Sequence, residues 1–297
     1  MMSDFRGSYT VMVTPFADDC RLDEARLRGF VDWQIKEGVQ GLIPLGSTGE
    51  FLSLTREERH MVASTVINEA KGRVPVLVGT AAEWTDEAVS LSKEAEALGA
   101  DGVMVVPPYY SSPTEDELFV HYRKIAEAIS IPVMVYNNPN TANVDLKASF
   151  VARLAEIDNI SYIKESSGDV TRTTEIIRLC GDRMTVFAGY HPWESYLVGA
   201  QGYVSVFSNI APALSTELFK VTVDQANPNA GRDLYFRILS LLEALSGDLY
   251  VSATKAALGL IGRPVGPPRP PRLPLPAGKI ASLKPVLASL GLLPASR

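Results

Sequence analysis

The sequence has few cysteines and histidines and no long apolar run, and each of these absences excludes a class of protein. It contains only two cysteines, Cys20 and Cys180, which excludes a disulfide framework or a thiolate zinc site and fits a reducing compartment. Its three histidines lack ligand spacing and no carboxylate cluster replaces them, so we expect no metal. No apolar run approaches the roughly 20 residues of a membrane span. The N-terminus has no apolar signal core, and we expect a soluble, cytoplasmic protein.

Positive charge is also scarce, which argues against nucleic acid and membrane surfaces as partners. The 297 residues carry 28 Lys and Arg against 34 Asp and Glu, a net charge of −6, with no basic block. Such a chain lacks the concentrated positive charge that binds a phosphate backbone or an anionic membrane. Hydrophobic residues make up 46% and charged residues 21%, which is ordinary globular usage and excludes a disordered or fibrous chain.

The pattern that is present is an alternation of short apolar strands with longer segments of helical period. The predicted strands are 9–13, 41–45, 74–78, 102–106, 132–136, 160–164, 185–188 and 203–207. The predicted helices between them are 23–37, 55–70, 85–98, 114–129, 145–154, 170–179 and 193–198, with caps at Ser53 or Thr55, Thr85 and Thr114. Eight such units favour a (β/α)8 TIM barrel. An open doubly wound sheet is the alternative, but its glycine-rich turn is missing after the first strand.

Beyond residue 209 the strand pattern stops. Helical period continues over 213–225, 230–245 and 250–260, and a last short helix is predicted at 280–290. We therefore predict a barrel over residues 1–209 and a C-terminal helical appendage over 210–297. A proline-rich segment, 263–276, interrupts the appendage. It is either an extended strap over its own domain, which is the commoner case, or a polyproline motif that docks a partner.

Lys164 is the strongest candidate for chemistry, because catalytic groups of this barrel class lie at the C-terminal ends of strands. It ends an apolar strand and shares a face with Ile160 and Tyr162. Burial disfavours the ammonium form and lowers the pKa toward the range in which the free amine forms a Schiff base with a carbonyl. The alternative is a buried ion pair with Glu165, although adjacent strand residues point to opposite faces. The other nine lysines are expected on the surface.

Three other strand ends carry groups that could serve this amine. The turn Gly46–Glu50 has two glycines and two hydroxyls, which suit a small anion such as a carboxylate, although it could be an ordinary tight turn. It lacks the Gly-Lys-Ser/Thr of a nucleotide loop. Tyr136 could relay protons or simply pack, and Tyr109 and Tyr110 invite the same two interpretations.

Together these motifs resemble the dihydrodipicolinate synthase / N-acetylneuraminate lyase family along the whole chain. They are Gly46-Ser47-Thr48-Gly49-Glu50, Tyr109-Tyr110, Tyr136-Asn137-x-Pro139, Ile163-Lys164-Glu165 and the late Gly262-Arg263-Pro264. The resemblance implies a class I, Schiff-base lyase or aldolase that acts on pyruvate or a related 2-keto acid without a metal or organic cofactor. It also implies a homo-oligomer, a tetramer built as a dimer of tight dimers.

Carried over by position, the resemblance assigns roles to single residues. Lys164 would form the imine, Tyr136 would be the proton relay, and Thr48 would hydrogen-bond that tyrosine. Tyr110 would complete the relay from the neighbouring subunit. The backbone of Ser47 and Thr48, after Gly46, would hold the keto acid carboxylate. Val204 would help to shape the pocket.

Two departures from the family concern the second substrate. The arginine that follows the Tyr-Asn-x-Pro segment in the synthase proper is Thr141 here, and threonine cannot clamp a carboxylate with two hydrogen bonds. The Gly-Tyr-Asp-Glu run of the sialate lyases is Gly189-Tyr190-His191-Pro192, without either acid. We therefore expect a smaller or less hydroxylated substrate. The candidate contacts are Asn140, Thr141, Asn143, Gly189, His191, Phe207 and Ser208.

The expected function is thus a lyase or aldolase working through an imine on Lys164. A dehydratase or deaminase of a small 2-keto acid or hydroxylated pyrroline carboxylate would use the same imine and is the main alternative. The synthase proper is disfavoured by Thr141. A keto-acid-binding protein without catalysis is the most distant alternative.

Overall fold

The computed structural model describes residues 5–294. Tertiary contacts group them into two units. Residues 5–7 and 75–204 form the first unit, and residues 8–74 and 205–294 form the second. The predicted division after residue 209 follows the strand pattern rather than these contacts, and it stays a prediction.

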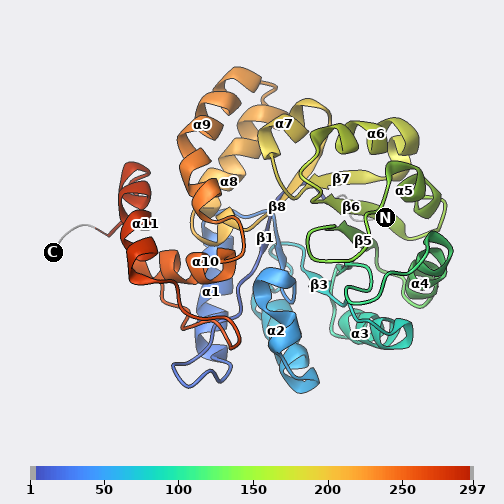
Figure 1. Cartoon of the computed structure of the whole chain (residues 1–297), viewed down its shortest axis with the longest axis horizontal. Coiled ribbons are helices and arrows are strands. Elements are labelled where there is room, and N and C mark those ends of the chain that lie inside the picture. The colour runs from blue at the N-terminus through green and yellow to red at the C-terminus, as the bar shows by residue number, and fades with distance from the viewer. Residues whose placement is uncertain (1–4, 295–297) are drawn as a thin grey trace. The chain divides into compact units, whose positions relative to one another are not determined.

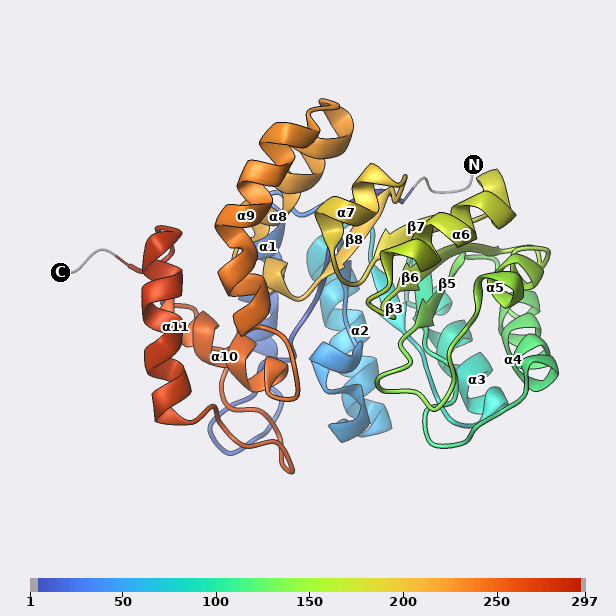
Figure 2. The same ribbon diagram turned by 45° about the horizontal axis from the view of Figure 1, so that its top comes forward.

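The first unit contains six parallel strands among its described residues, ordered β8-β7-β6-β5-β4-β3. Its strands are β3 (Leu77–Gly79), β4 (Gly102–Val105), β5 (Val133–Asn137), β6 (Ile160–Glu165), β7 (Thr185–Ala188) and β8 (Gly202–Ser205, whose last residue belongs to the second unit). Its helices are α3 (Thr85–Ala97), α4 (Glu115–Glu127), α5 (Ala148–Leu154), α6 (Val170–Cys180) and α7 (Pro192–Leu197). Figures 1 and 2 show α3–α6 outside these strands.

These strands form because their residues are apolar on both faces. Val133, Met134 and Val135 are all fully buried, as a parallel sheet covered by helices requires. The register of β5 against β6 sets Tyr136 beside Lys164 and Asn137 beside Glu165. The two residues of greatest chemical interest are therefore neighbours on one face of the sheet.

The predicted helix caps at Thr55 and Thr114 are confirmed. Thr114 forms a capping box with Glu117 at the start of α4, and in the second unit Thr55 does the same with Glu58. The predicted cap at Thr85 is wrong, because Trp84 occupies that position and Thr85 is already helical. Its hydroxyl pairs instead with His121 Nδ1 at 2.9 Å.

The second unit begins with two parallel strands and ends with the C-terminal helices. Its elements are β1 (Gly7–Val11, whose first residue belongs to the first unit), α1 (Glu24–Lys36), β2 (Gly41–Ile43), α2 (Arg56–Ala70), α8 (Pro212–Phe219, continued by a π-helical turn, Lys220–Asp224), α9 (Pro228–Ala244), α10 (Tyr250–Leu260) and α11 (Ala277–Ser289). α11 packs against α9 and α10, as Figure 2 shows. Between α10 and α11, residues 263–276 contain no helix or strand and pack on the same unit, where Phe16 N donates to Val265 O at 2.9 Å.

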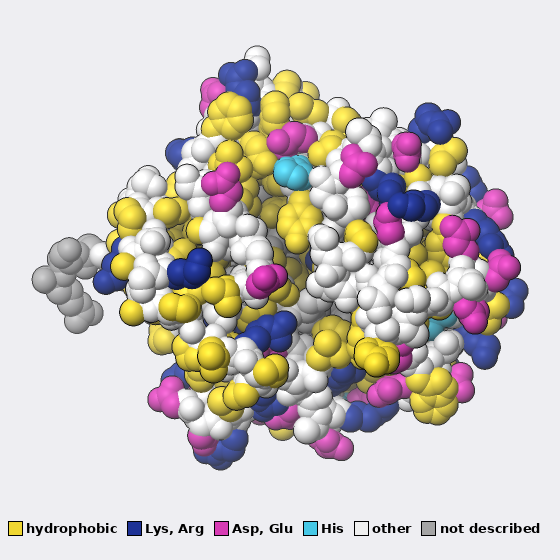
Figure 3. Space-filling model, in the orientation of Figure 1, with side chains coloured by type: hydrophobic (Ala, Val, Ile, Leu, Met, Phe, Trp, Pro, Cys, Tyr) yellow, Lys and Arg dark blue, Asp and Glu magenta, His cyan; other side chains and the backbone are white. Residues whose placement is uncertain are grey.

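All eight predicted strands are thus present among the described residues, each followed by a helix or helical turn, and further helices follow at the C-terminus. The fold is the predicted (β/α)8 barrel with a C-terminal helical region. Charged side chains of both signs are interspersed over the face seen in Figure 3. Within residues 5–294 no helix combines the length and apolar character of a membrane span.

Candidate active site

Lys164 and Tyr136 form the centre of the candidate site in the first unit. The Lys164 ammonium lies 3.9 Å from the centre of the Tyr136 ring, and the two residues are only 5% and 6% exposed. No carboxylate among residues 5–294 forms an ion pair with this lysine. Burial therefore acts unopposed and lowers the pKa of Lys164 to about 7. A substantial fraction of the amine is unprotonated near neutral pH, which is the form that attacks a carbonyl.

Asn138 holds the phenol of Tyr136. Its side-chain amide donates a hydrogen bond of 2.8 Å to Tyr136 Oη, and Asn138 is itself buried. The phenol oxygen accepts this bond, which fixes its position beside the strand end. Sequence reasoning did not single out Asn138; its only signal was its place directly after the Tyr-Asn pair at the strand end.

Glu165 does not pair with Lys164, so the buried ion pair considered above is not formed. Its carboxylate accepts hydrogen bonds from the backbone of Ser167 (2.6 Å) and the side chain of Asn137 (2.9 Å). Burial raises the pKa of Glu165 despite these bonds. The two side chains do not meet because successive residues of a strand point to opposite faces, and Lys164 and Glu165 are adjacent in β6.

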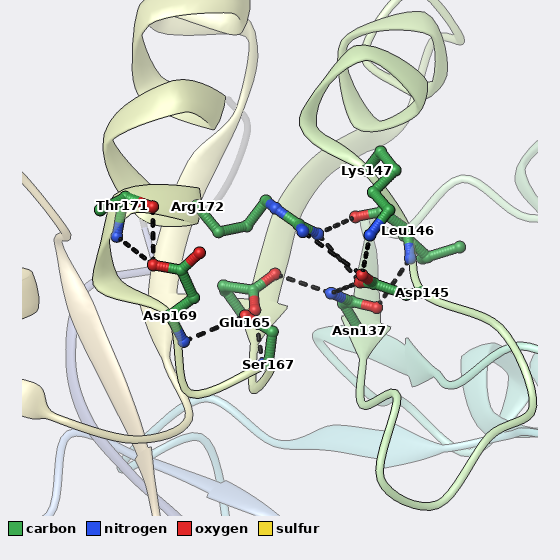
Figure 4. Close-up of polar contacts among 9 residues, drawn as sticks. All are labelled: Asn137, Asp145, Leu146, Lys147, Glu165, Ser167, Asp169, Thr171 and Arg172. Atoms are coloured by element: carbon green, nitrogen blue, oxygen red, sulfur yellow. Dashed lines mark hydrogen bonds and ion pairs between the residues drawn. The ribbon is translucent and has the colours of Figure 1, made fainter.

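A polar network on the Glu165 face joins β5 and β6 to the segment that follows β5 (Figure 4). Asn137 Nδ2 also donates to Asp145 (3.2 Å), and Asn137 Oδ1 accepts from Leu146 N (3.0 Å). Arg172 donates to both oxygens of Asp145, at 2.9 and 3.3 Å. Partial burial works to raise the pKa of Asp145, but its hydrogen bonds outweigh burial and hold that pKa well below its usual range. The network fixes the two strands on which Lys164 and Tyr136 lie.

Tyr110 lies in a loop whose backbone is fixed while its side chain projects outward. The Glu83 carboxylate accepts hydrogen bonds from the backbone of Tyr109, Tyr110 and Ser111, at 2.9, 3.1 and 2.8 Å. Asn143 donates to the Tyr110 carbonyl at 2.6 Å. The Tyr110 residue is 86% exposed. Sequence reasoning missed Glu83, which has no motif of its own and acts through residues far along the chain.

The predicted specificity residues of the first unit lie in different surroundings. Asn140, Thr141 and His191 are exposed, whereas Val204 is buried at the end of β8. Gly189 N donates to Glu165 O at 2.7 Å, and a Cβ there would lie 1.7 Å from Ser166 Oγ. The close approach of the segment at Gly189 to the end of β6 therefore requires glycine at this position.

A cavity of about 390 Å³ opens at the other ends of the strands, away from Lys164. It is lined by residues that begin β6 and β7, among them Ile160, Ser161 and Thr185. Because barrel chemistry lies at the C-terminal strand ends, this cavity is not part of the candidate site.

In the second unit, Gly46–Glu50 forms a tight turn around a single 3-10 segment, Ser47–Gly49. Gly49 N donates to Gly46 O (3.0 Å), Glu50 N donates to Ser47 O (3.1 Å), and Thr14 Oγ1 donates to Gly49 O (2.7 Å). Within residues 5–294 these bonds leave the N–H groups of Ser47 and Thr48 without an acceptor. Thr48 is buried and Ser47 is half-buried. Two adjacent N–H donors suit a carboxylate.

Phe207 and Lys255, both of the second unit, are buried. Phe207, a predicted substrate contact, is buried in a 3-10 turn, Phe207–Asn209. Lys255 was expected on the surface, and that expectation is wrong: its side chain is 2% exposed and contacts Glu50. An ion pair with a residue distant in sequence makes this burial possible.

Nothing in the described part of the chain groups three or more His, Cys, Asp or Glu side chains as metal ligands. Among the histidines, His121 is buried between α3 and α4, where burial lowers its pKa to about 4. It is therefore neutral at physiological pH and serves to join the two helices through Thr85.

Residues 4–289 match the family model described as the Dihydrodipicolinate synthetase family. A 4-hydroxy-tetrahydrodipicolinate synthase of Syntrophobacter fumaroxidans is 37% identical over 292 residues, which cover 97% of this chain and 100% of that protein. The enzyme of the same name from Pelobacter propionicus is 38% identical over 291 residues, with coverage of 97% and 100%.

Solved structures agree with this match. The chloride-inhibited dihydrodipicolinate synthase of Acinetobacter baumannii, complexed with pyruvate, has a TM-score of 0.94 at 36% identity, covering 97% of this chain and 99% of that one. YagE, a prophage protein of E. coli K12 described as belonging to the same family and also complexed with pyruvate, has a TM-score of 0.93 at 33% identity, covering 98% and 100%. With the fold and the family match in agreement over nearly the whole chain, this protein belongs to the dihydrodipicolinate synthetase family and is a lyase that needs no cofactor.

Proposed function

We propose that this lyase acts on pyruvate or a related 2-keto acid through an imine on Lys164. The observation that carries the proposal is the buried amine itself, with a pKa of about 7 and no carboxylate partner within residues 5–294. Nζ attacks the C2 carbonyl, water leaves, and the protonated imine draws electrons from the neighbouring C–H bond. Loss of that proton gives an enamine, from which a C–C bond is made or broken.

Tyr136 is the proposed proton relay, and Ser47 and Thr48 are the proposed carboxylate site. The position of Tyr136 beside the Lys164 amine supports the first role. The two N–H donors of the turn Gly46–Glu50 support the second. The proposed hydrogen bond from Thr48 to Tyr136, and the place of Val204 in the pocket, rest on the family resemblance.

Tyr110 is proposed to complete the relay in a neighbouring subunit, within a homotetramer built from tight dimers. Its exposed side chain on a fixed backbone supports this role. One solved relative is described as a monomeric dihydrodipicolinate synthase variant, so the oligomeric state of this chain calls for its own measurement by sedimentation. The two free cysteines support a cytoplasmic location.

The second candidate is a dehydratase or deaminase that uses the same imine. It is favoured by Thr141, an exposed threonine where the synthase proper has an arginine. Arg172, which contacts the segment after β5, is engaged by Asp145 and the Leu146 carbonyl. Asn140, His191, Gly189 and Phe207 are the proposed specificity residues in either case. The relatives named 4-hydroxy-tetrahydrodipicolinate synthase make that condensation the third reaction to assay.

The test is reduction with borohydride in the presence of pyruvate, followed by intact mass and peptide mapping. We expect one covalent adduct, on Lys164, and none in Lys164→Ala. A folded wild-type protein without an adduct would overturn the imine and leave a non-catalytic binding role. Assays for pyruvate, water and ammonia release against 2-keto acids and pyrroline carboxylates then separate the lyase from the dehydratase or deaminase.

A further inference from the structure

A second buried lysine lies in the second unit, directly against the turn Gly46–Glu50. Lys255 Nζ is 2.7 Å from Glu50 Oε1, and the two side chains are 2% and 0% exposed. Lys255 comes from α10, whereas Glu50 is the last residue of the turn. Burial lowers the pKa of Lys255, and the carboxylate of Glu50 opposes that change by stabilising the ammonium.

The pair joins four segments that are far apart in the sequence. Lys255 Nζ donates to the carbonyl of Thr14 (2.9 Å) and to that of Pro267 (3.0 Å). The second oxygen of Glu50 accepts a hydrogen bond from Arg269 N at 2.9 Å. The segment after β1, the turn, α10 and the proline-rich segment thus meet at one ammonium and one carboxylate.

Arg269 extends the junction outward. Its guanidinium forms two short hydrogen bonds with Glu58, at 2.6 and 2.5 Å, and donates to the carbonyls of Cys20 and Ser53. Two cations, Lys255 and Arg269, face two anions, Glu50 and Glu58, so the formal charges of the cluster cancel. A neutral cluster exerts little net attraction on a bound anion, and its effect on a ligand must come from geometry.

The geometry of the turn needs support from outside. Glu50 adopts a left-handed backbone conformation, with φ of 56°, which costs a residue with a side chain on the order of 1 kcal/mol. Such a conformation persists when the surrounding structure holds it in place. The hydrogen bonds inside the turn involve the N–H groups of Gly49 and Glu50. Glu50 directly follows the 3-10 segment Ser47–Gly49 and its N–H group bonds to Ser47 O, so holding Glu50 in place supports the segment that carries the N–H groups of Ser47 and Thr48.

We propose that Lys255 is a positioning residue for carboxylate recognition: through Glu50 it fixes the turn that binds the keto acid carboxylate, and it links that turn to the C-terminal region. The inference rests on the proposed function, because it needs Ser47 and Thr48 as the carboxylate site. It adds a residue of α10, about 200 positions away in the sequence, to the determinants of substrate binding.

The test compares two ketones that differ in the carboxylate. Borohydride trapping on Lys164 is measured against concentration with pyruvate and with acetone, in the wild type, Lys255→Met and the surface control Lys279→Met. We expect Lys255→Met to raise the half-saturating concentration of pyruvate by about tenfold or more, since small displacements of binding groups have effects of that size or larger. Trapping of acetone stays within about twofold in every variant, and Lys279→Met behaves as the wild type.

A double variant separates position from stability. Lys255→Met leaves Glu50 buried without its partner, whereas Lys255→Met with Glu50→Gln has no unpaired buried charge. We expect the double variant to be folded and still to discriminate poorly between the two ketones. An unchanged preference for pyruvate in this folded variant, or an equal loss with both ketones, would overturn the positioning role. A wild type that traps neither ketone would overturn the proposed function instead.

Discussion

The two buried lysines, one in each unit, differ in their partners more than in their burial. Lys164 has the ring of Tyr136 beside it and no carboxylate partner among the described residues, and its pKa falls to about 7. Lys255 contacts a carboxylate and two backbone carbonyls. Burial lowers the pKa of both lysines, but only at Lys255 does a carboxylate oppose that change, and there the side chain joins separate segments of the chain. The contrast assigns chemistry to one lysine and positioning to the other.

Replacing the two lysines by methionine should shift stability in opposite directions. At Lys255 the change leaves the Glu50 carboxylate buried without its cationic partner. We therefore expect the free energy of unfolding to fall by about 3–5 kcal/mol at pH 7. Denaturant unfolding measures it, with the exposed Lys279→Met as the control expected to lie within about 0.5 kcal/mol of the wild type. A Lys255→Met protein as stable as the control would mean that the pair contributes nothing.

Lys164→Met should stabilise the protein, by at most about 5 kcal/mol, because the folded state no longer holds a buried, unpaired amine. The pKa of this lysine is lowered from 10.5 to about 7 on folding. Below pH 7 the cost of burying the ammonium is fully present in the wild type. Between pH 7 and 10.5 the unfolded chain binds more protons, so wild-type stability rises with pH and the advantage of the variant disappears. Unfolding curves at pH 6, 8 and 10 measure this convergence, and a constant difference would contradict it.

Tyr136→Phe should slow turnover by about 10²-fold or more, the usual contribution of a positioned acid–base group. Imine trapping with pyruvate should survive, because the ring remains beside the amine. Tyr122→Phe is a matched control, since Tyr122 is buried and its hydroxyl donates to Val105 O. Equal turnover in the wild type and Tyr136→Phe would remove this phenol from the mechanism.

The smallest expected effect is at the network behind the site. Asp145 has a folded-state pKa below its ordinary 3.8, so it contributes stability above pH 3.8 that is lost as the pH falls through the folded pKa. We expect Asp145→Asn to lower stability by about 1 kcal/mol or less at pH 7, because the pair is partly exposed to solvent. The difference should shrink in acid unfolding below pH 3.8. If the stability difference between the wild type and Asp145→Asn grew toward low pH, the pKa of Asp145 would not be lowered on folding.

The sequence indicated the fold and the reactive lysine because both depend on local pattern. Apolar, β-branched runs determined the strands, and the alternation of strand 160–164 put Lys164 and Glu165 on opposite faces. The burial of Lys255 had no local signal, since its helix is rich in small residues and its partner Glu50 is distant in sequence. Glu83 likewise acts on a loop 26 residues away and beyond. Such contacts arise only from the tertiary structure.

The most direct measurement of the central claim is the pH dependence of adduct formation between pyruvate and the wild-type protein. The rate of borohydride trapping on Lys164 should rise with a midpoint near pH 7, the pKa of this buried amine. Peptide mapping should locate the adduct on Lys164 throughout that range. A midpoint near 10.5, the pKa of an ordinary lysine, or an adduct spread over several lysines would contradict the account.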